Sequence, residues 1–290
     1  MLVLTVTIVL LLFQLKGNLA CMQNDRFLYS WLQLTRAFPL PWLAQVFIAL
    51  GLPCFIAVLL LNITEDWLWG LFTLILHVFM LTYALGRGEF NRYIFAYQEA
   101  FANQDKNQIS LALGSLDTDY IAPASHELAA LAQDARKIFL LCLLKRYMVV
   151  LFWYVFLGPV VSLLYRLVSL VYEHYRELRP EDETSLFVLD KAIQLLEWPI
   201  ARIWGLCFAS ISSPGAILLV WCEYFLDFKK NTEDFLLNIS SVALLPEQVH
   251  QDDVPEEAVI EDAIHESNMI QQLFQRSLIV IIVLAFMMSF

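Results

Sequence analysis

Long apolar runs separated by short polar stretches constrain this chain more than any other feature. Nonpolar side chains dominate residues 1–15, 43–61 and 67–85, and hydrophobic residues make up 59% of the sequence against 16% charged residues. A soluble domain has about 45–50% apolar and about 25% charged residues. A helix needs about 20 apolar residues to cross the hydrocarbon core of a bilayer. The pattern therefore predicts an integral membrane protein built from helices.

The charges beside these runs predict which side of the membrane each connection occupies. No Lys or Arg precedes the first run and Lys16 follows it, so the run lacks the charge order of a cleaved signal peptide. Basic residues flank the runs at 16–42 and 86–137, whereas 62–66 has none. The positive-inside rule then places 16–42 and 86–137 in the cytoplasm and 62–66 outside.

The polar segment 86–137 is predicted to be helical as well. Its apolar side chains recur at the spacing of one helix face. They are Phe90, Tyr93, Ile94, Tyr97 and Phe101 in a first set, and Leu128, Leu131, Ala135, Ile138 and Phe139 in a second. We expect a cytoplasmic helical hairpin that packs on the membrane unit.

Two further apolar runs are interrupted. Gly158-Pro159 divides residues 148–171, and Ser212-Ser213-Pro214-Gly215 divides residues 198–225. Proline breaks or kinks a helix, and a broken helix at membrane depth needs protein or water around it. Residues 172–197, between these runs, can lie outside or return to the cytoplasm. Their basic residues favour a re-entrant or interfacial arrangement.

The negative charge of the chain is concentrated near its C-terminal end. The formal net charge is −11, and residues 227–272 alone hold eleven acidic side chains and two lysines. A block of like charge predicts a solvated loop and excludes nucleic acid as a partner. The apolar run that follows predicts a C-terminal membrane helix.

The predicted fold is therefore all-α: a polytopic helical membrane protein with four to six membrane-embedded helices, two of them broken or re-entrant, and cytoplasmic helical excursions. Its predicted regions are a three-helix membrane segment (1–85), a cytoplasmic hairpin (86–137), a membrane core with broken helices (138–228), an acidic cytoplasmic loop (229–272) and a C-terminal membrane helix (273–290).

Chemistry is sought in ionisable residues at membrane depth, because such residues are costly and need partners. No catalytic motif is recognised, and the five cysteines form no CxxC pair, so neither a metal nor a cofactor is predicted. The ligand-binding candidates are Glu89, Arg92, Arg166, Glu197, Arg202 and Glu223. They could form ion pairs that fix helix register, or they could line a polar cavity between the broken helices. His77, in the third run, could be functional or bonded to a neighbouring helix.

Several of these segments, taken in order, resemble the AmpE family. Trp153-Tyr154, Leu157-Gly158-Pro159 and Tyr165-Arg166 resemble its FW…GGP region. Residues 195–202 (LLEWPIAR) resemble its LDWxPxR segment, and Leu226-Asp227-Phe228 resembles its GDF step. This chain differs in three respects: Glu197 replaces the aspartate, proline directly follows Trp198, and the 212–215 turn replaces a GHG-type turn.

The resemblance implies a multi-pass protein of the bacterial inner membrane and a regulatory signalling modulator linked to peptidoglycan recycling and β-lactamase induction. The AmpE family is also similar to the CbiB/CobD membrane proteins of cobalamin synthesis, so a membrane-embedded amide-forming ligase is the alternative, and a small transporter is a third. Whether the chain is an enzyme stays open, although the absence of catalytic motifs favours a non-enzyme. The expected partners are the lipid bilayer and either a cell-wall-derived small molecule or another membrane protein.

Overall fold

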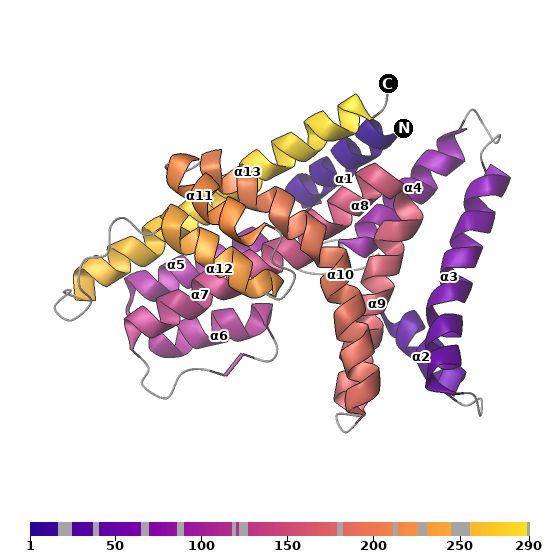
Figure 1. Cartoon of the computed structure of the whole chain (residues 1–290), viewed down its shortest axis with the longest axis horizontal. Helices are drawn as coiled ribbons and strands as arrows, with labels where there is room; N and C mark the ends of the chain where they lie inside the picture. Colours follow the sequence, from indigo (N-terminus) through magenta and orange to yellow (C-terminus); the bar gives the residue numbers. More distant parts are fainter. Residues whose placement is uncertain are drawn as a thin grey trace. The chain divides into compact units, whose positions relative to one another are not determined.

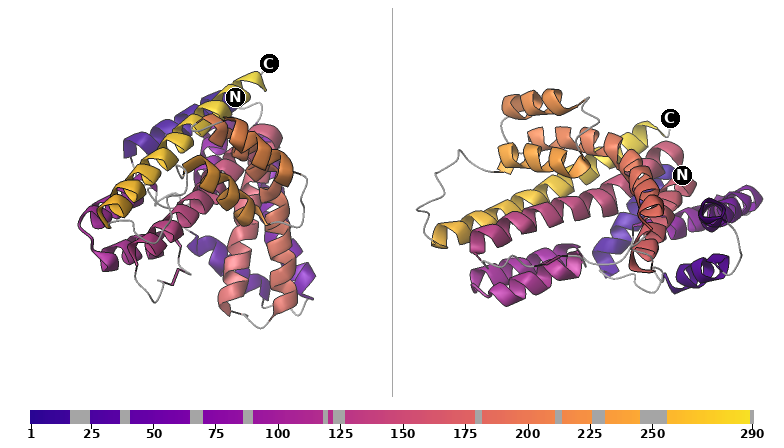
Figure 2. Two further views of the ribbon diagram at one scale, coloured as in Figure 1. Left: turned by 60° about the vertical axis from the view of Figure 1, so that its left-hand side comes forward. Right: turned by 60° about the horizontal axis from the view of Figure 1, so that its bottom comes forward.

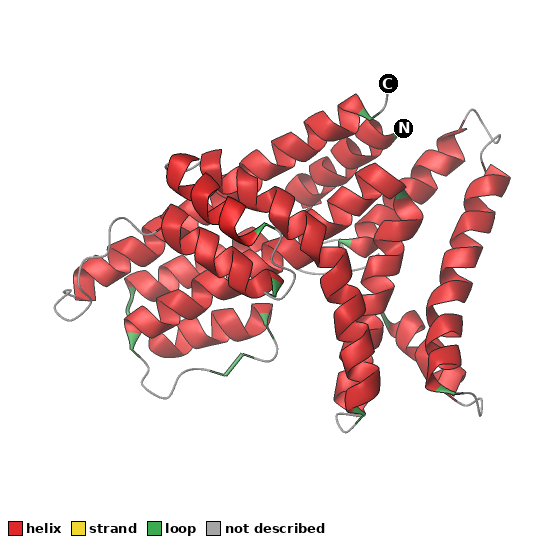
Figure 3. Cartoon of the chain, viewed as in Figure 1, coloured by secondary structure: helices red, strands yellow, loops and turns green. Residues whose placement is uncertain are grey.

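The computed structural model describes residues 1–16, 25–36, 41–64, 70–85, 90–117, 120–121, 127–178, 182–210, 214–225, 231–244 and 256–288. The regular elements within these ranges are all helices, and none is a strand (Figure 3). The all-α prediction is therefore confirmed for the described part of the chain.

The helices belong to two compact units that alternate along the sequence. Unit 1 comprises residues 1–88, 149–197 and 281–290, and unit 2 comprises residues 89–148 and 198–280. Three unit boundaries fall inside continuous stretches of helix, at 148/149, 197/198 and 280/281. These units do not follow the five regions predicted from the sequence, whose boundaries stay a prediction.

Unit 1 contains the helices near the start of the chain and three from its middle (Figure 1). Its helices are α1 (Leu2–Lys16), α2 (Arg26–Arg36), α3 (Trp42–Thr64), α4 (Leu71–Ala84), α8 (Val149–Leu157), α9 (Pro159–Leu178) and α10 (Glu183–Cys207) as far as Glu197. Pro53 lies inside α3 without ending it, as expected of a membrane helix. One face of α3 carries exposed apolar side chains, among them Phe47 and Phe55, which are 74% and 67% exposed.

The break between α8 and α9 is a single residue wide. Gly158 adopts a left-handed φ of 86°, a conformation that side chains disfavour. Its amide donates to the Tyr154 carbonyl at 3.0 Å, which closes α8, and Pro159 begins α9. Proline suits the first turn of a helix because that turn needs no amide donor. The predicted interruption at Gly158-Pro159 is confirmed.

Unit 2 contains the shorter polar helices, the last part of α10 and most of the last helix. They are α5 (Phe90–Ala102), α6 (Lys106–Leu116), α7 (Leu128–Leu143), a π-helical turn (Leu144–Met148), α10 from Trp198, a 3-10 turn (Phe208–Ser210), α11 (Pro214–Tyr224), α12 (Thr232–Leu244) and α13 (Glu256–Met287) as far as Val280. α10 ends before the second predicted interruption and α11 begins at Pro214, which confirms that this apolar run is broken too.

The predicted apolar stripes form the core of unit 2. Phe90, Ile94, Tyr97 and Phe101 of α5 are buried, and Tyr97 packs edge-on against Phe139 of α7 with ring centroids 5.1 Å apart. These contacts follow from the three- and four-residue spacing of the side chains, which gathers them on one face of each helix.

Two predicted regions differ from the structure in their local form. The segment 86–137 holds parts of three helices rather than a hairpin, because α6 lies between the two predicted helices. Asp105 caps the start of α6, since its side chain accepts from the amides of Asn107 and Gln108. The acidic segment contains α12 and the first half of α13 rather than an irregular loop. In α12 the apolar side chains Phe235, Leu236 and Ile239 are buried and fix the helix.

Three described helices are long and apolar enough to cross a membrane. They are Trp42–Thr64, Leu128–Leu157 (α7 through α8) and Ala258–Met287 of α13. Leu2–Phe13 and Leu71–Ala84 are shorter apolar helices. Together these helices are consistent with the predicted helical membrane protein.

Candidate functional site

The candidate residues that the structure describes are divided between the two units. Arg92 on α5 and Glu223 on α11 are both exposed, and Glu89 lies outside the described residues. Arg166 and Glu197 belong to unit 1 and Arg202 to unit 2, and all three are largely buried. Among the described candidates, these three are therefore the ones whose charge has been taken out of water.

Glu197 is held by a tyrosine in unit 1. The Tyr165 hydroxyl on α9 donates to Oε1 of Glu197 on α10 at 2.8 Å, and both side chains are buried. Burial, followed by the nearby Glu197 carboxylate, raises the pKa of Tyr165 well above its ordinary value. Beside this pair, the Trp153 indole on α8 donates to the Leu196 carbonyl at 3.1 Å. Three helices thus converge on the Glu197 position.

Arg166, one residue further along α9, pairs with Asp25. Its Nη2 lies 3.4 Å from Oδ2 of Asp25, which immediately precedes α2, and both side chains are at least four-fifths buried. Eight residues along α9, the His174 ring packs on the Tyr29 ring of α2 at 5.3 Å. Burial and the neighbouring acidic side chains raise the pKa of Tyr29. The pairing with Asp25 was missed, because 141 residues separate the partners.

His77 is bonded within the apolar part of unit 1. Its Nδ1 lies 2.9 Å from the Tyr154 hydroxyl, so a hydrogen bond joins α4 to α8. The two rings meet nearly at right angles, with centroids 6.0 Å apart. Such bonds between apolar helices act as polar links. Of the two interpretations of His77, this geometry is the one expected for a histidine bonded to a neighbouring helix.

Arg202 occupies an aromatic environment in unit 2. It is 1% exposed and is the largest fully buried side chain among the described residues. Its guanidinium carbon lies 3.9 Å from the centre of the Phe235 ring on α12 and 5.2 Å from that of Trp198, one turn earlier on α10. A guanidinium over a ring face is attracted by the negative face of the π system. The aromatic rings therefore stabilise this buried cation.

The contact between α10 and α12 is close enough to require glycine. A Cβ on Gly205 would lie 2.9 Å from Cζ of Phe235 and 3.0 Å from Cδ1 of Ile239. The Phe235 ring is thus confined by the Gly205 backbone and by the Arg202 guanidinium. The Trp221 indole of α11 also donates to the Arg202 carbonyl at 2.8 Å. We call this group the arginine–aromatic cluster. It consists of Trp198, Arg202, Gly205, Trp221 and Phe235.

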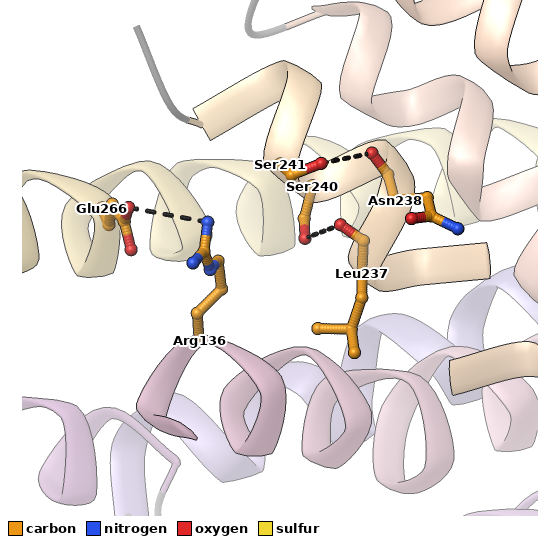
Figure 4. Close-up of polar contacts among 6 residues, drawn as sticks. All are labelled: Arg136, Leu237, Asn238, Ser240, Ser241 and Glu266. Atoms are coloured by element: carbon orange, nitrogen blue, oxygen red, sulfur yellow. Dashed lines mark hydrogen bonds and ion pairs between the residues drawn. The ribbon is translucent and has the colours of Figure 1, made fainter. Parts of the chain in front are cut away.

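A second polar contact in unit 2 involves residues that were not candidates. Figure 4 shows Arg136 of α7 reaching toward Glu266 of α13, with Nη1 and Oε1 3.8 Å apart. On α12, Ser240 and Ser241 donate to the carbonyls of Leu237 and Asn238 in their own helix (Figure 4). Lys137, next to Arg136, forms an ion pair with Glu233 of α12. Arg136 directly follows Ala135 of the predicted α7 stripe. This position next to a buried residue was the sequence signal that could have identified Arg136 as a candidate.

The contacts of Arg166, Glu197 and His77 join different elements of unit 1. No group of three or more His, Cys, Asp or Glu side chains suitable for a metal ion occurs among the described residues. Arg166 pairs with a carboxylate, and Glu197 and His77 each contact a tyrosine hydroxyl. Such contacts fix the positions of helices and set the charge of their surroundings, which suits a protein that binds or changes conformation.

Comparison with known proteins supplies the family. No curated protein and no solved structure matches the chain. A family model described as regulatory signalling modulator protein AmpE matches residues 1–289, which include both units and every candidate residue. The chain therefore belongs to the AmpE family of regulatory signalling modulators.

Proposed function

We propose that this protein is a signalling modulator of the bacterial inner membrane that links peptidoglycan recycling to the induction of β-lactamase. The observation that carries the proposal is the AmpE family match over residues 1–289. The apolar helices of sufficient length to cross a bilayer support a membrane location. The ligand expected for such a modulator is a fragment of the cell wall.

The geometry of the buried charges favours a modulator over an enzyme. General acid–base catalysis needs a titratable group within reach of a substrate proton. Glu197 instead accepts from Tyr165, and Arg202 lies against two rings at 1% exposure. Both arrangements are suited to holding helices in a defined register. A signalling protein needs such a register, because a ligand can shift only an equilibrium between defined states.

The proposal is tested in a bacterium with an inducible β-lactamase that lacks its own copy of this gene. The measurement is the ratio of β-lactamase activity with and without a β-lactam inducer. Deletion should change this ratio, and expression of the wild-type protein should restore the parental value. An unchanged ratio in the deletion strain would refute the link to β-lactamase induction.

Two arginine variants separate a specific effect from loss of protein. Arg202→Ala removes a buried arginine, whereas Arg92→Ala removes an exposed one from the same unit. We expect Arg92→Ala to restore the ratio and Arg202→Ala to fail. Immunoblots of isolated membranes show whether Arg202→Ala fails at equal abundance or because the protein is lost.

Purified protein distinguishes binding from turnover. Disaccharide-peptide fragments of the cell wall are titrated into the protein in detergent, and the mixture is then examined by mass spectrometry. A modulator gives binding heat and leaves the fragments unchanged. Formation of a new amide product would instead support the ligase alternative and contradict the proposal.

A further inference from the structure

Unit 1 contains a helical hairpin whose side of the membrane can be inferred from its contacts. α9 and the first half of α10 lie side by side in Figure 1 and in the left view of Figure 2. Tyr165 and Glu197 meet across the two helices at 2.8 Å. They lie 13 and 14 residues from the ends Leu178 and Glu183. At about 1.5 Å per residue, each arm beyond this bond is about 20 Å long.

α2 is attached to the descending arm of this hairpin at two levels. Asp25, at the start of α2, pairs with Arg166, and Tyr29 packs on His174 one turn later. Arg166 lies near the middle of α9, and His174 is only four residues from its end. The end of the hairpin is therefore on the same side of unit 1 as α2.

α2 in turn marks one end of a membrane-crossing helix. α3 begins at Trp42, six residues after the end of α2, and the Trp31 indole donates to the Ala49 carbonyl of α3 at 3.4 Å. The other end of α3 faces α4, because Thr73 donates to the Thr64 carbonyl at 2.9 Å. In Figure 1 the lower ends of α9 and α10 lie toward the Trp42 end of α3, away from its Thr64 end.

The surface of the hairpin fits a position at the edge of the bilayer. Glu173, Arg176, Glu177 and Glu183 are exposed at its end, where hydrocarbon would be costly for charge. Along the outer face of α10, Phe187 is 62% exposed and the Lys191 ammonium lies over its ring at 5.6 Å. An aromatic ring beside a long cationic side chain is typical of the membrane–water interface.

We infer that the α9–α10 hairpin is an interfacial element whose end lies on the same membrane face as α2, and not an external loop between two crossings. Positive charge supports the same face independently. Arg26 precedes α3 and Arg176 and Lys191 lie on the hairpin, while the Asn62–Asp66 stretch beyond α3 has no Lys or Arg. By the positive-inside rule this shared face is the cytoplasmic one. The inference holds whether or not the proposed signalling function is correct.

Cysteine labelling of the full chain tests this arrangement. Glu177→Cys and Thr184→Cys place a thiol at the exposed end of the hairpin, Ser30→Cys places one on α2, and Asn62→Cys places one at the far end of α3. Each variant is expressed in bacterial membranes and treated with a membrane-impermeant maleimide that carries a mass tag. Labelling is compared in spheroplasts and in inverted vesicles, and the unmodified protein with its own cysteines gives the background.

The expected result is a shift of one tag above background for Glu177→Cys, Thr184→Cys and Ser30→Cys in inverted vesicles only. Asn62→Cys should show the shift in spheroplasts only. Labelling of the hairpin variants in spheroplasts, together with Asn62→Cys, would overturn the inference. Labelling of Ser30→Cys and Asn62→Cys from one side would also overturn it, because α3 would then not separate the two faces. If Glu177→Cys does not accumulate in membranes, Glu183→Cys takes its place.

Discussion

The buried candidate charges of the two units contact different kinds of side chain. In unit 1, Glu197 accepts from the Tyr165 hydroxyl at 2.8 Å, and Arg166 lies 3.4 Å from Asp25. In unit 2, the Arg202 guanidinium lies against the faces of Phe235 and Trp198. The contacts described for Glu197 and Arg166 in unit 1 are thus with oxygen atoms, whereas those described for the Arg202 guanidinium in unit 2 are with aromatic rings.

The difference changes what each site depends on. A hydrogen bond weakens steeply with distance and angle, so loss of one hydroxyl removes it. Contact with a ring face depends on the flat shape of the guanidinium and on tight packing around it. The stability of the Glu197 and Arg166 contacts in unit 1 should therefore depend on single polar atoms. The stability of the Arg202 contacts in unit 2 should depend on the size and shape of the side chains.

The largest effect is expected at Arg202. Arg202→Ala removes the largest fully buried side chain and leaves a cavity against Phe235 and Trp198. Loss of a large buried side chain costs about 3–5 kcal/mol. Arg202→Lys keeps the charge without the planar group, so it should lose less. Thermal unfolding in detergent measures both variants. An Arg202→Ala protein that melts like the wild type would remove the contrast between the units.

A smaller loss is expected when the Tyr165 hydroxyl is removed. Tyr165→Phe retains the ring and deletes the donor to Glu197. Hydrogen bonds to charged groups contribute about 1.5–3 kcal/mol. Denaturation of Tyr165→Phe is compared with that of Tyr172→Phe, a less buried tyrosine on the same helix. Equal stability of the two variants would show that Glu197 does not depend on this hydroxyl.

Gly205 tests whether the arginine–aromatic cluster depends on shape. Gly205→Ala gains up to about 1 kcal/mol of helix propensity. Its Cβ, however, would lie 2.9 Å from Phe235, and overpacking costs about 1–3 kcal/mol. We expect a net loss of about 1 kcal/mol in the free energy of unfolding. Gly114→Ala is the control, because no atom lies within 4 Å of its Cβ. A stabilised Gly205→Ala protein would contradict close packing at α12.

The polar link in the apolar part of unit 1 should be weaker still. A double-mutant cycle of His77→Leu and Tyr154→Phe isolates the bond between α4 and α8. Hydrogen bonds between membrane helices average about 0.6 kcal/mol in such cycles. A coupling energy near zero in detergent unfolding would mean that the two residues act independently.

The smallest effect concerns Tyr120 of unit 2 at high pH. Burial and its hydrogen bond to Asp134 raise the pKa of Tyr120 to about 12. The pKa of Tyr120 in the folded protein lies above its unfolded value of about 10. The contribution of Tyr120 to the free energy of unfolding is therefore complete below pH 10 and is lost between about pH 10 and 12. Tyr120→Phe should flatten the fall of stability in this range. Tyrosinate absorbance gives the midpoint directly.

Much of the fold could be predicted because local patterns determine it. The spacing of Phe90, Ile94, Tyr97 and Phe101 predicts one buried helix face, and Gly158-Pro159 predicts a break. Both are present in the structure. α6 was missed, because the signal for a new helix at Asp105 is one short polar turn. The acidic segment was taken for a loop because its charge obscured the apolar spacing of Phe235 and Ile239.

The candidate site was predictable only in part. Arg166, Glu197 and Arg202 were correctly identified as charges within apolar surroundings, since apolar neighbours along the chain reveal that much. The contacts with Asp25, Tyr165 and Phe235 were not predicted, because these residues belong to other elements. Sequence spacing cannot give contacts that depend on how helices pack. A tyrosine or phenylalanine partner also carries no charge to draw attention to it.

The alternation of the two units has a consequence for the order of synthesis. Unit 1 begins with residues 1–88 but also includes residues 281–290, which follow the last stretch of unit 2. A ribosome therefore releases all of unit 2 before it has completed unit 1. Helices α1, α3 and α4 are therefore synthesised long before the last segment of the unit to which they belong.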